Sequence, residues 1–207
     1  MTEEQKLRIA QIQKIEGEHI CLRRITDADT DKIIRWRNMP HVVEWFIYRA
    51  EVTRADHEKW LAEQVGTGRV EQFIITVKDG NREIGSQYFT HIDPEAGSAE
   101  FGIFIGEPDA LGKNYGTEVL QLALKYAFEE MHLREVTLRA LAHNERAIRS
   151  YENCGFTICP ELTQEAVLDG VKRRIVFMPT AGTDTPGTPA AAVSMTPSSG
   201  KRRMLRC

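Results

Sequence analysis

The stretch Leu111-Gly112-Lys113-Asn114-Tyr115-Gly116-Thr117-Glu118 joins an apolar segment to an amphipathic one. The amphipathic segment has apolar residues at helical spacing, namely Leu120, Ala123, Leu124, Ala127, Phe128 and Met131. The first N–H groups of a helix lack intrahelical partners and carry partial positive charge, so a turn leading into a helix can bind a diphosphate. The stretch therefore predicts an anion-binding turn at the start of a helix that packs on a sheet.

Alternating strand and helix patterns surround this stretch. The segment 99–105 before it is apolar except for Glu100, which predicts a central strand. Further strands are expected at 20–23, 73–77, 83–89, 136–141 and on both sides of Asp169-Gly170. Helices are expected from Thr26 to Pro40, from Thr53 to about Gly66, and at 144–153. The pattern predicts an α/β (α+β) fold, a mixed sheet with helices on its faces.

A second informative segment, Asn144 to Phe156, follows about thirty residues after the anion-binding turn. It is expected to form a helix that carries Tyr151 and stops at Gly155 in the left-handed conformation. Two common phosphate-binding motifs are excluded, because the chain lacks both the Gly-x-Gly-x-x-Gly fingerprint and the Gly-Lys-Ser/Thr of a P-loop.

Together the two segments resemble the coenzyme A elements of the GNAT superfamily of N-acetyltransferases. The first is similar to the family pattern Arg/Gln-x-x-Gly-x-Gly/Ala, with Leu111 in place of Arg or Gln and Asn114 in place of the first glycine. Asparagine tolerates the left-handed conformation, so the turn is expected to keep its shape. The second is similar to the family segment Asn-x-x-Ala-x-x-x-Tyr. The resemblance covers approximately Ile20 to Met178.

The resemblance implies a mostly antiparallel sheet of about seven strands with a splayed central pair. It also implies acetyl-CoA as co-substrate. The pantetheine amides would pair with backbone at Phe104 and Ile105, and Asn144 would lie near the pantetheine arm. The phosphates would meet backbone N–H groups, those of Lys113, Asn114, Gly116 and Thr117.

Chemistry at a thioester requires a proton donor for the leaving thiolate and a base for the attacking ammonium. Tyr151 is the candidate acid, and Glu100, alone in an apolar strand, is the candidate base. The alternative for Glu100 is a carboxylate paired with an arginine, and His91 is a weaker candidate base. Cys154 lies at a helix end where a small buried residue suffices, so a covalent acyl-cysteine is not expected.

The acceptor amine would bind under the first two helices, where the resemblance indicates Trp36, Glu44 and Trp45. The alternatives are an aromatic core and a solvated acidic face. The segment around Trp36 is most similar to the branch of ribosomal-protein alanine, spermidine and amino-sugar N-acetyltransferases. His41 to Trp45 also resembles aminoglycoside 6′-N-acetyltransferases. The rival from another class is a non-catalytic acyl-CoA-binding module.

Length and composition place limits on the remaining properties. The 207 residues predict one domain at 19–178, after an N-terminal extension at 1–18 and before a disordered Thr/Pro/Ala/Ser-rich tail at 179–207. A net charge of −3 argues against a nucleic-acid partner, and no run reaches the roughly 18 apolar residues of a membrane span. Cytoplasmic location is the expectation. No metal is expected, because the cysteine spacing fits no zinc site. The sequence does not decide between a monomer and a homodimer.

Overall fold

The computed structural model describes residues 3–182, which form one sheet with helices on both faces. The strands are β1 (Lys14–Glu16), β2 (Ile20–Arg24), β3 (Glu71–Val77), β4 (Arg82–Asp93), β5 (Ser98–Ile105), β6 (Glu135–Leu141), β7 (Cys159–Leu168) and β8 (Val171–Ala181). The helices are α1 (Glu3–Gln11), α2 (Thr30–Arg37), α3 (Pro40–Val43), α4 (Arg54–Trp60), α5 (Tyr115–Lys125) and α6 (Glu145–Glu152). Short π-helical turns, Leu61–Val65 and Tyr126–Glu130, extend α4 and α5.

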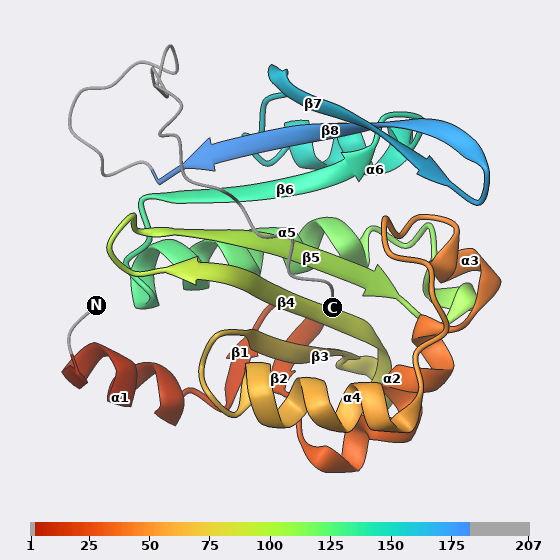
Figure 1. Cartoon of the computed structure of the whole chain (residues 1–207). Helices are drawn as coiled ribbons and strands as arrows, with labels where there is room; N and C mark the ends of the chain where they lie inside the picture. The colour runs from red at the N-terminus through yellow and green to blue at the C-terminus, as the bar shows by residue number, and fades with distance from the viewer. Residues whose placement is uncertain (1–2, 183–207) are drawn as a thin grey trace.

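The sheet has eight strands in the order β1-β2-β3-β4-β5-β6-β8-β7. Strands β5 and β6 are parallel and pair only over Ser98–Glu100 and Glu135–Thr137, whereas the other neighbours among the described strands are antiparallel. Beyond these three residue pairs the two strands diverge, as Figure 1 shows for the centre of the molecule. The expected mixed, mostly antiparallel sheet with a splayed central pair is confirmed.

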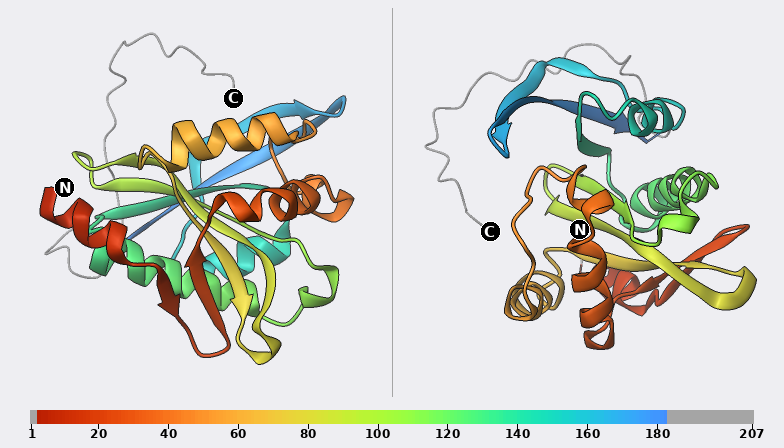
Figure 2. Two further views of the ribbon diagram at one scale, coloured as in Figure 1. Left: turned by 90° about the horizontal axis from the view of Figure 1, so that it is seen from below. Right: turned by 90° about the vertical axis from the view of Figure 1, so that its right-hand side faces the viewer.

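The two faces of the sheet carry separate cores. On one face α5 contacts β2 and buries the expected stripe, in which Leu120, Ala123 and Ala127 are at most 1% exposed. On the other face α2 and α4 cover β3 and β4 around Ile74 and Phe104. Figure 2 shows α5 and the pair α2 and α4 on opposite sides.

Local sequence accounts for several element boundaries. Thr53 caps α4 as expected, since its hydroxyl accepts from Asp56 N–H at 3.2 Å while the Asp56 carboxylate accepts from Thr53 N–H at 3.0 Å. The turn between β3 and β4 has positive φ at Gly80 (71°) and Asn81 (48°), which confirms the expected hairpin.

Both ends of the chain differ from the expectation. The N-terminal residues add a strand and a helix: Ile15 pairs with Leu22, and Ile9 of α1 is 4% exposed in the core. At the other end β8 continues through Pro179 to Ala181, three residues past Met178. Pro179 lies opposite Thr137, so the sheet includes residues expected in the tail. The rest of the tail lies outside the described residues.

Candidate active site

The turn before α5 has the backbone shape that a diphosphate site requires. Gly112 has φ of 81° and Asn114 has φ of 62°, so the asparagine adopts the left-handed conformation expected of it. The N–H groups of Lys113, Asn114 and Gly116 donate to no acceptor within residues 3–182. A Cβ added at Gly116 would meet nothing within 4 Å, so the space before the helix is open. These residues fit an anionic group bound by backbone donors.

Thr117 differs from the expected geometry at this turn. Its N–H donates to the Asn114 carbonyl at 3.1 Å and is therefore used within the first turn of α5. Its hydroxyl lies 2.9 Å from the Ser150 hydroxyl on α6. Thr117 thus joins the start of α5 to the second candidate coenzyme A segment.

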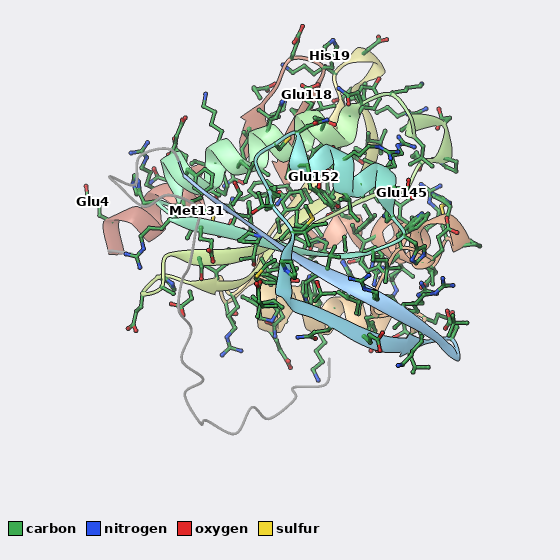
Figure 3. The ribbon with its side chains drawn as sticks, turned by 90° about the horizontal axis from the view of Figure 1, so that it is seen from above. Glu4, His19, Glu118, Met131, Glu145 and Glu152 are labelled. Carbon is green, nitrogen blue, oxygen red and sulfur yellow. The ribbon has the colours of Figure 1, made fainter. Side chains whose placement is uncertain are left out.

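Glu118 fixes the first turn of α5 to the sheet. Its carboxylate accepts from the N–H of His19 at 2.8 Å and of Ile20 at 3.1 Å, and it lies beside the His19 ring. Figure 3 shows Glu118 and His19 side by side. Burial alone would raise the pKa of Glu118, but the two N–H donors and the His19 ring outweigh it and lower that pKa. The helix start is therefore held in place independently of any ligand.

The link between the hydroxyl groups of Thr117 and Ser150 gives a first prediction. Ser150→Ala removes one hydrogen bond, worth about 1 kcal/mol, so we expect the Kd for coenzyme A to rise about fivefold while kcat changes little. Titration calorimetry measures the affinity. Arg149→Ala, on the same helix and exposed, is the matched control and should leave Kd unchanged. An unaltered Kd in Ser150→Ala would show that this link does not position the turn.

The splay exposes one edge of β5 next to these helices. From Phe101 to Ile105, β5 pairs with β4 on one side and with none of the described strands on the other. An unpaired strand edge presents backbone N–H and C=O groups that an extended amide chain can pair with. Phe104 and Ile105, the residues expected to bind pantetheine, lie in this segment.

Two tyrosines belong to the elements around this edge, Tyr88 on β4 and Tyr151 on α6. The Tyr88 ring from β4 lies across Gly102, where an added Cβ would come within 2.2 Å of it. Tyr151 of α6 packs against the core and contacts Phe156, with ring centroids 6.2 Å apart. Burial, with a smaller contribution from Tyr88, raises the pKa of Tyr151 to about 12. Tyr151 thus keeps its proton at neutral pH and can donate it.

Asn144 has a local structural role that the expectation did not include. Its side-chain oxygen accepts from Ala147 N–H at 3.3 Å, so Asn144 is the N-cap of α6. The helix then ends as expected, with Gly155 at φ of 91°. The cap directs α6, and Tyr151 with it, alongside α5 (Figure 3).

Glu100 is paired with an arginine, which was the alternative to its role as a base. Its carboxylate accepts from Arg139 Nε at 2.8 Å and lies 3.5 Å from His91 Nδ1. His91 itself is exposed and has φ of 51° at an irregularity of β4. Because Glu100 pairs in register with Thr90, it faces the same side of the sheet as Tyr88. The role of Glu100 as base stays a prediction.

The structure corrects one of the three residues expected to bind the acceptor. Trp36 is 0% exposed, its ring lies against Gly106, and its Nε1 donates to Glu107 at 2.7 Å. It is a core residue that cannot present a surface to a ligand, because the apolar packing of α2 on the sheet encloses it.

Glu44 and Trp45 are exposed, in the segment that follows α3. The Trp45 ring packs on His143, with centroids 5.6 Å apart, and Arg49 bonds the Asp169 carboxylate at 2.6 Å. His143 and Asp169 belong to the far side of the splay, beyond β6. The segment after α3 therefore spans the open end of the splay seen in Figure 1.

Sequence reasoning missed three polar residues of this region: Tyr88, Arg139 and Arg37. Tyr88 and Phe89 are adjacent on β4, so their side chains point to opposite faces of the sheet. The sequence alone does not show which of the two points toward α2. Arg139 would have been found only from the pairing of β5 with β6, which brings Thr137 opposite Glu100.

No group of three or more His, Cys, Asp or Glu side chains is placed to hold a metal within residues 3–182. Across the same residues, no helix is both long enough and apolar enough to cross a bilayer.

Comparison with known proteins agrees with this geometry. The spermidine N(1)-acetyltransferase of Vibrio cholerae is 34% identical over 165 residues, which cover 78% of this chain and 94% of that protein. An uncharacterized protein of Methanocaldococcus jannaschii is 29% identical over 144 residues, 68% of this chain but only 28% of its own length. The crystal structure of the Vibrio cholerae spermidine N-acetyltransferase with CoA and spermine superposes with a TM-score of 0.74, at 22% identity over 80% of this chain and 96% of that one.

The family model of the acetyltransferase (GNAT) domain matches residues 19–157, a segment that contains the turn before α5, the free edge of β5 and Tyr151. This match covers most of the chain, and the structural likeness independently shows the same fold. The chain therefore belongs to the GNAT acetyltransferase family, as an acetyl-CoA-dependent N-acetyltransferase.

Proposed function

We propose that the chain transfers the acetyl group of acetyl-CoA to a bound primary amine by direct attack, without a covalent enzyme intermediate. The observation that carries the proposal is the unpaired edge of β5 from Phe101 to Ile105, which leads into a turn whose N–H groups at Lys113, Asn114 and Gly116 have no acceptor within residues 3–182. Burial raises the pKa of the Cys154 thiol, which makes it a poor nucleophile. The non-catalytic module and the aminoglycoside acetyltransferase are not favoured by the relatives.

Each part of the site has a distinct role in this proposal. The free N–H groups of Lys113, Asn114 and Gly116 bind the diphosphate, with Thr117 holding the turn to α6. The edge at Phe104 and Ile105 pairs with the pantetheine amides, and Asn144 lies next to that arm. Tyr151 donates a hydrogen bond, and then its proton, to the departing sulfur. The main contribution of the chain is to position the two reactants in a near-attack geometry.

The attacking amine must lose a proton, and Glu100 is the carboxylate that we propose takes it through water. Glu100→Gln is expected to flatten the rise of kcat/KM with pH, because an amide cannot accept the proton. The matched control is Arg139→Gln, which removes the ion-pair partner but leaves the carboxylate. A Glu100→Gln enzyme with an unaltered pH profile would leave Glu100 only the ion pair with Arg139.

The test of the proposed function is thiol release from acetyl-CoA in the presence of a panel of amines. The panel contains polyamines, amino-sugars, aminoglycosides and peptides with free N-termini. Release of coenzyme A that requires an amine, with the acetylated amine detected by mass spectrometry, is the expected result. Tight binding of coenzyme A without turnover on any amine would favour the non-catalytic module instead.

Assembly of several copies is part of the proposal. A structure of the Vibrio cholerae spermidine N-acetyltransferase is described as dodecameric. We expect this chain also to form a homo-oligomer, at least a dimer, which light scattering of the full chain measures; a monomer at working concentration would contradict this.

A further inference from the structure

Arg37, the last residue of α2, is a cation without an anionic partner. Its guanidinium makes no hydrogen bond and no ion pair within residues 3–182. Its neighbour Arg35, by contrast, bonds the Glu107 carboxylate at 2.6 Å. A half-buried guanidinium without a carboxylate is costly, because an arginine cannot lose its proton to escape the cost. Burial lowers the pKa of Arg37, and the hydroxyl groups of Tyr88 and Tyr48 partly oppose this shift.

Aromatic rings lie close to the guanidinium of Arg37. Its Cζ lies 3.5 Å from the centroid of the Phe46 ring and 5.9 Å from that of Phe104. A guanidinium stacked by its face on a ring keeps its N–H donors in the plane, where they remain available to an acceptor. The contact with Phe46 therefore holds the guanidinium of Arg37 in place while its N–H donors have no acceptor within residues 3–182.

Arg37 lies on the face of the sheet that α2 covers, where the acceptor amine is expected to bind. Phe104 and Gly102 belong to the unpaired segment of β5. The Phe104 side chain, and the Tyr88 ring that lies across Gly102, are on the face of the sheet that α2 covers. The anion-binding turn of α5 lies on the opposite face (Figure 2). The diphosphate of coenzyme A thus has its own donors across the sheet, and Arg37 is left for the second substrate.

We propose that Arg37 determines acceptor specificity by pairing with an anionic group, a carboxylate or a phosphate, carried on the same molecule as the reacting amine. The planar fork of a guanidinium matches both groups in a bidentate geometry. The same charge repels a polyamine, whose further ammonium groups would lie near Arg37. This inference rests on the proposed function and narrows its acceptor class.

The experiment compares amines that differ by one anion. The carboxylate arm compares 5-aminopentanoate with pentylamine, the phosphate arm compares glucosamine 6-phosphate with glucosamine, and spermidine is the cationic arm. In at least one pair, the wild-type enzyme is expected to have a kcat/KM about tenfold to hundredfold higher for the amine with the anion than for the amine without it. This ratio is the effect of one charge-assisted hydrogen bond. The arm with the larger ratio identifies carboxylate or phosphate.

Arg37→Gln is expected to remove this preference by raising KM for the amine that carries the anion. For the partner amine without the anion, kcat/KM is expected to change less than about threefold. Turnover of the amines without the anion, pentylamine and glucosamine, is thus the control for folding. Arg37→Lys should restore part of the preference, because it keeps the charge without the fork. Arg35→Gln removes the same charge from the same helix and should leave the preference unchanged.

The outcomes separate the two proposals. No turnover with any of these amines would overturn the proposed function and this inference with it. Turnover that ignores the anion, or that prefers spermidine, overturns only the inference. An Arg37→Gln enzyme that loses activity equally on every amine also overturns it, because the residue would then be structural.

Discussion

Tyr151→Phe is expected to lower kcat by about 10²- to 10⁴-fold, the contribution of a positioned proton donor, and to leave the Kd for coenzyme A almost unchanged. The reason is that phenylalanine keeps the ring that packs against Phe156 but lacks the hydroxyl that we propose donates a proton to the departing sulfur. Single-turnover kinetics with saturating acetyl-CoA measure the chemical step, and calorimetry measures Kd.

Tyr126→Phe is the matched control for Tyr151→Phe. Tyr126 is another buried tyrosine, 2% exposed, and its hydroxyl lies near Arg24 and Glu71, away from the splay. It should lose some stability and keep kcat. A Tyr151→Phe enzyme with the kcat of the wild type would remove Tyr151 from the role of acid.

The raised pKa of Tyr151 also predicts the pH dependence of the acid step. An acid with a pKa of about 12 stays protonated throughout the neutral and mildly alkaline range. The rate should therefore not fall on the alkaline side until the pH approaches that value. A loss of kcat near pH 9, absent in Tyr151→Phe, would contradict the buried environment of this hydroxyl.

Much of the fold could be predicted from periodicity because most elements bury one face. The stripe of α5 and the apolar segment of β5 both have this property, and both are confirmed. Strand β1 could not be predicted in this way. It has three residues, of which only Ile15 is partly buried, and its existence depends on pairing with β2. Pro40 was expected to end a helix, yet after Arg37 the chain turns and Pro40 begins α3.

The candidate site was predictable where a motif is local and unpredictable where it depends on packing. The left-handed Asn114 and the helix stop at Gly155 follow from the conformational preferences of these two residues. The place of Arg37 does not, because its stacking on Phe46 requires the packing of α2 against the segment after α3. The burial of Trp36 depends on the same packing, and a tryptophan next to an arginine has no local signal that separates core from pocket.

The second large effect concerns Asp29, a carboxylate only 3% exposed that joins β2 to the start of α2. It accepts two bonds from Arg23, at 2.8 and 2.6 Å, and one from Thr26 N–H at 2.9 Å. Lys32 lies 3.2 Å away, and Glu83 shares both cations. Asp29 is thus a buried carboxylate whose charge is balanced by the partly buried side chains of Arg23 and Lys32.

Asp29→Ala is expected to lower the free energy of unfolding by about 2–3 kcal/mol, because it removes charge-assisted hydrogen bonds to a buried carboxylate while Arg23 and Lys32 keep Glu83 as a partner. Urea unfolding at pH 7, followed by circular dichroism, measures the change. Asp27→Ala, two residues earlier and exposed, is the matched control and should change the free energy by less than about 0.5 kcal/mol. A change this small in Asp29→Ala would mean that the network contributes little to stability.

The pH dependence gives this prediction a second, independent measurement. Burial would raise the pKa of Asp29, but Arg23, Thr26 and Lys32 outweigh it and hold that pKa well below its usual range. A carboxyl group with a lowered pKa in the folded state stabilises the protein above its unfolded pKa of about 3.9 and loses this contribution as the pH falls further. The stability difference between wild type and Asp29→Ala should therefore be full at pH 7 and shrink below about pH 4, since only the wild type has this carboxylate to protonate. A difference that stays constant down to pH 2 would mean that Asp29 contributes through packing and capping and not through its charge.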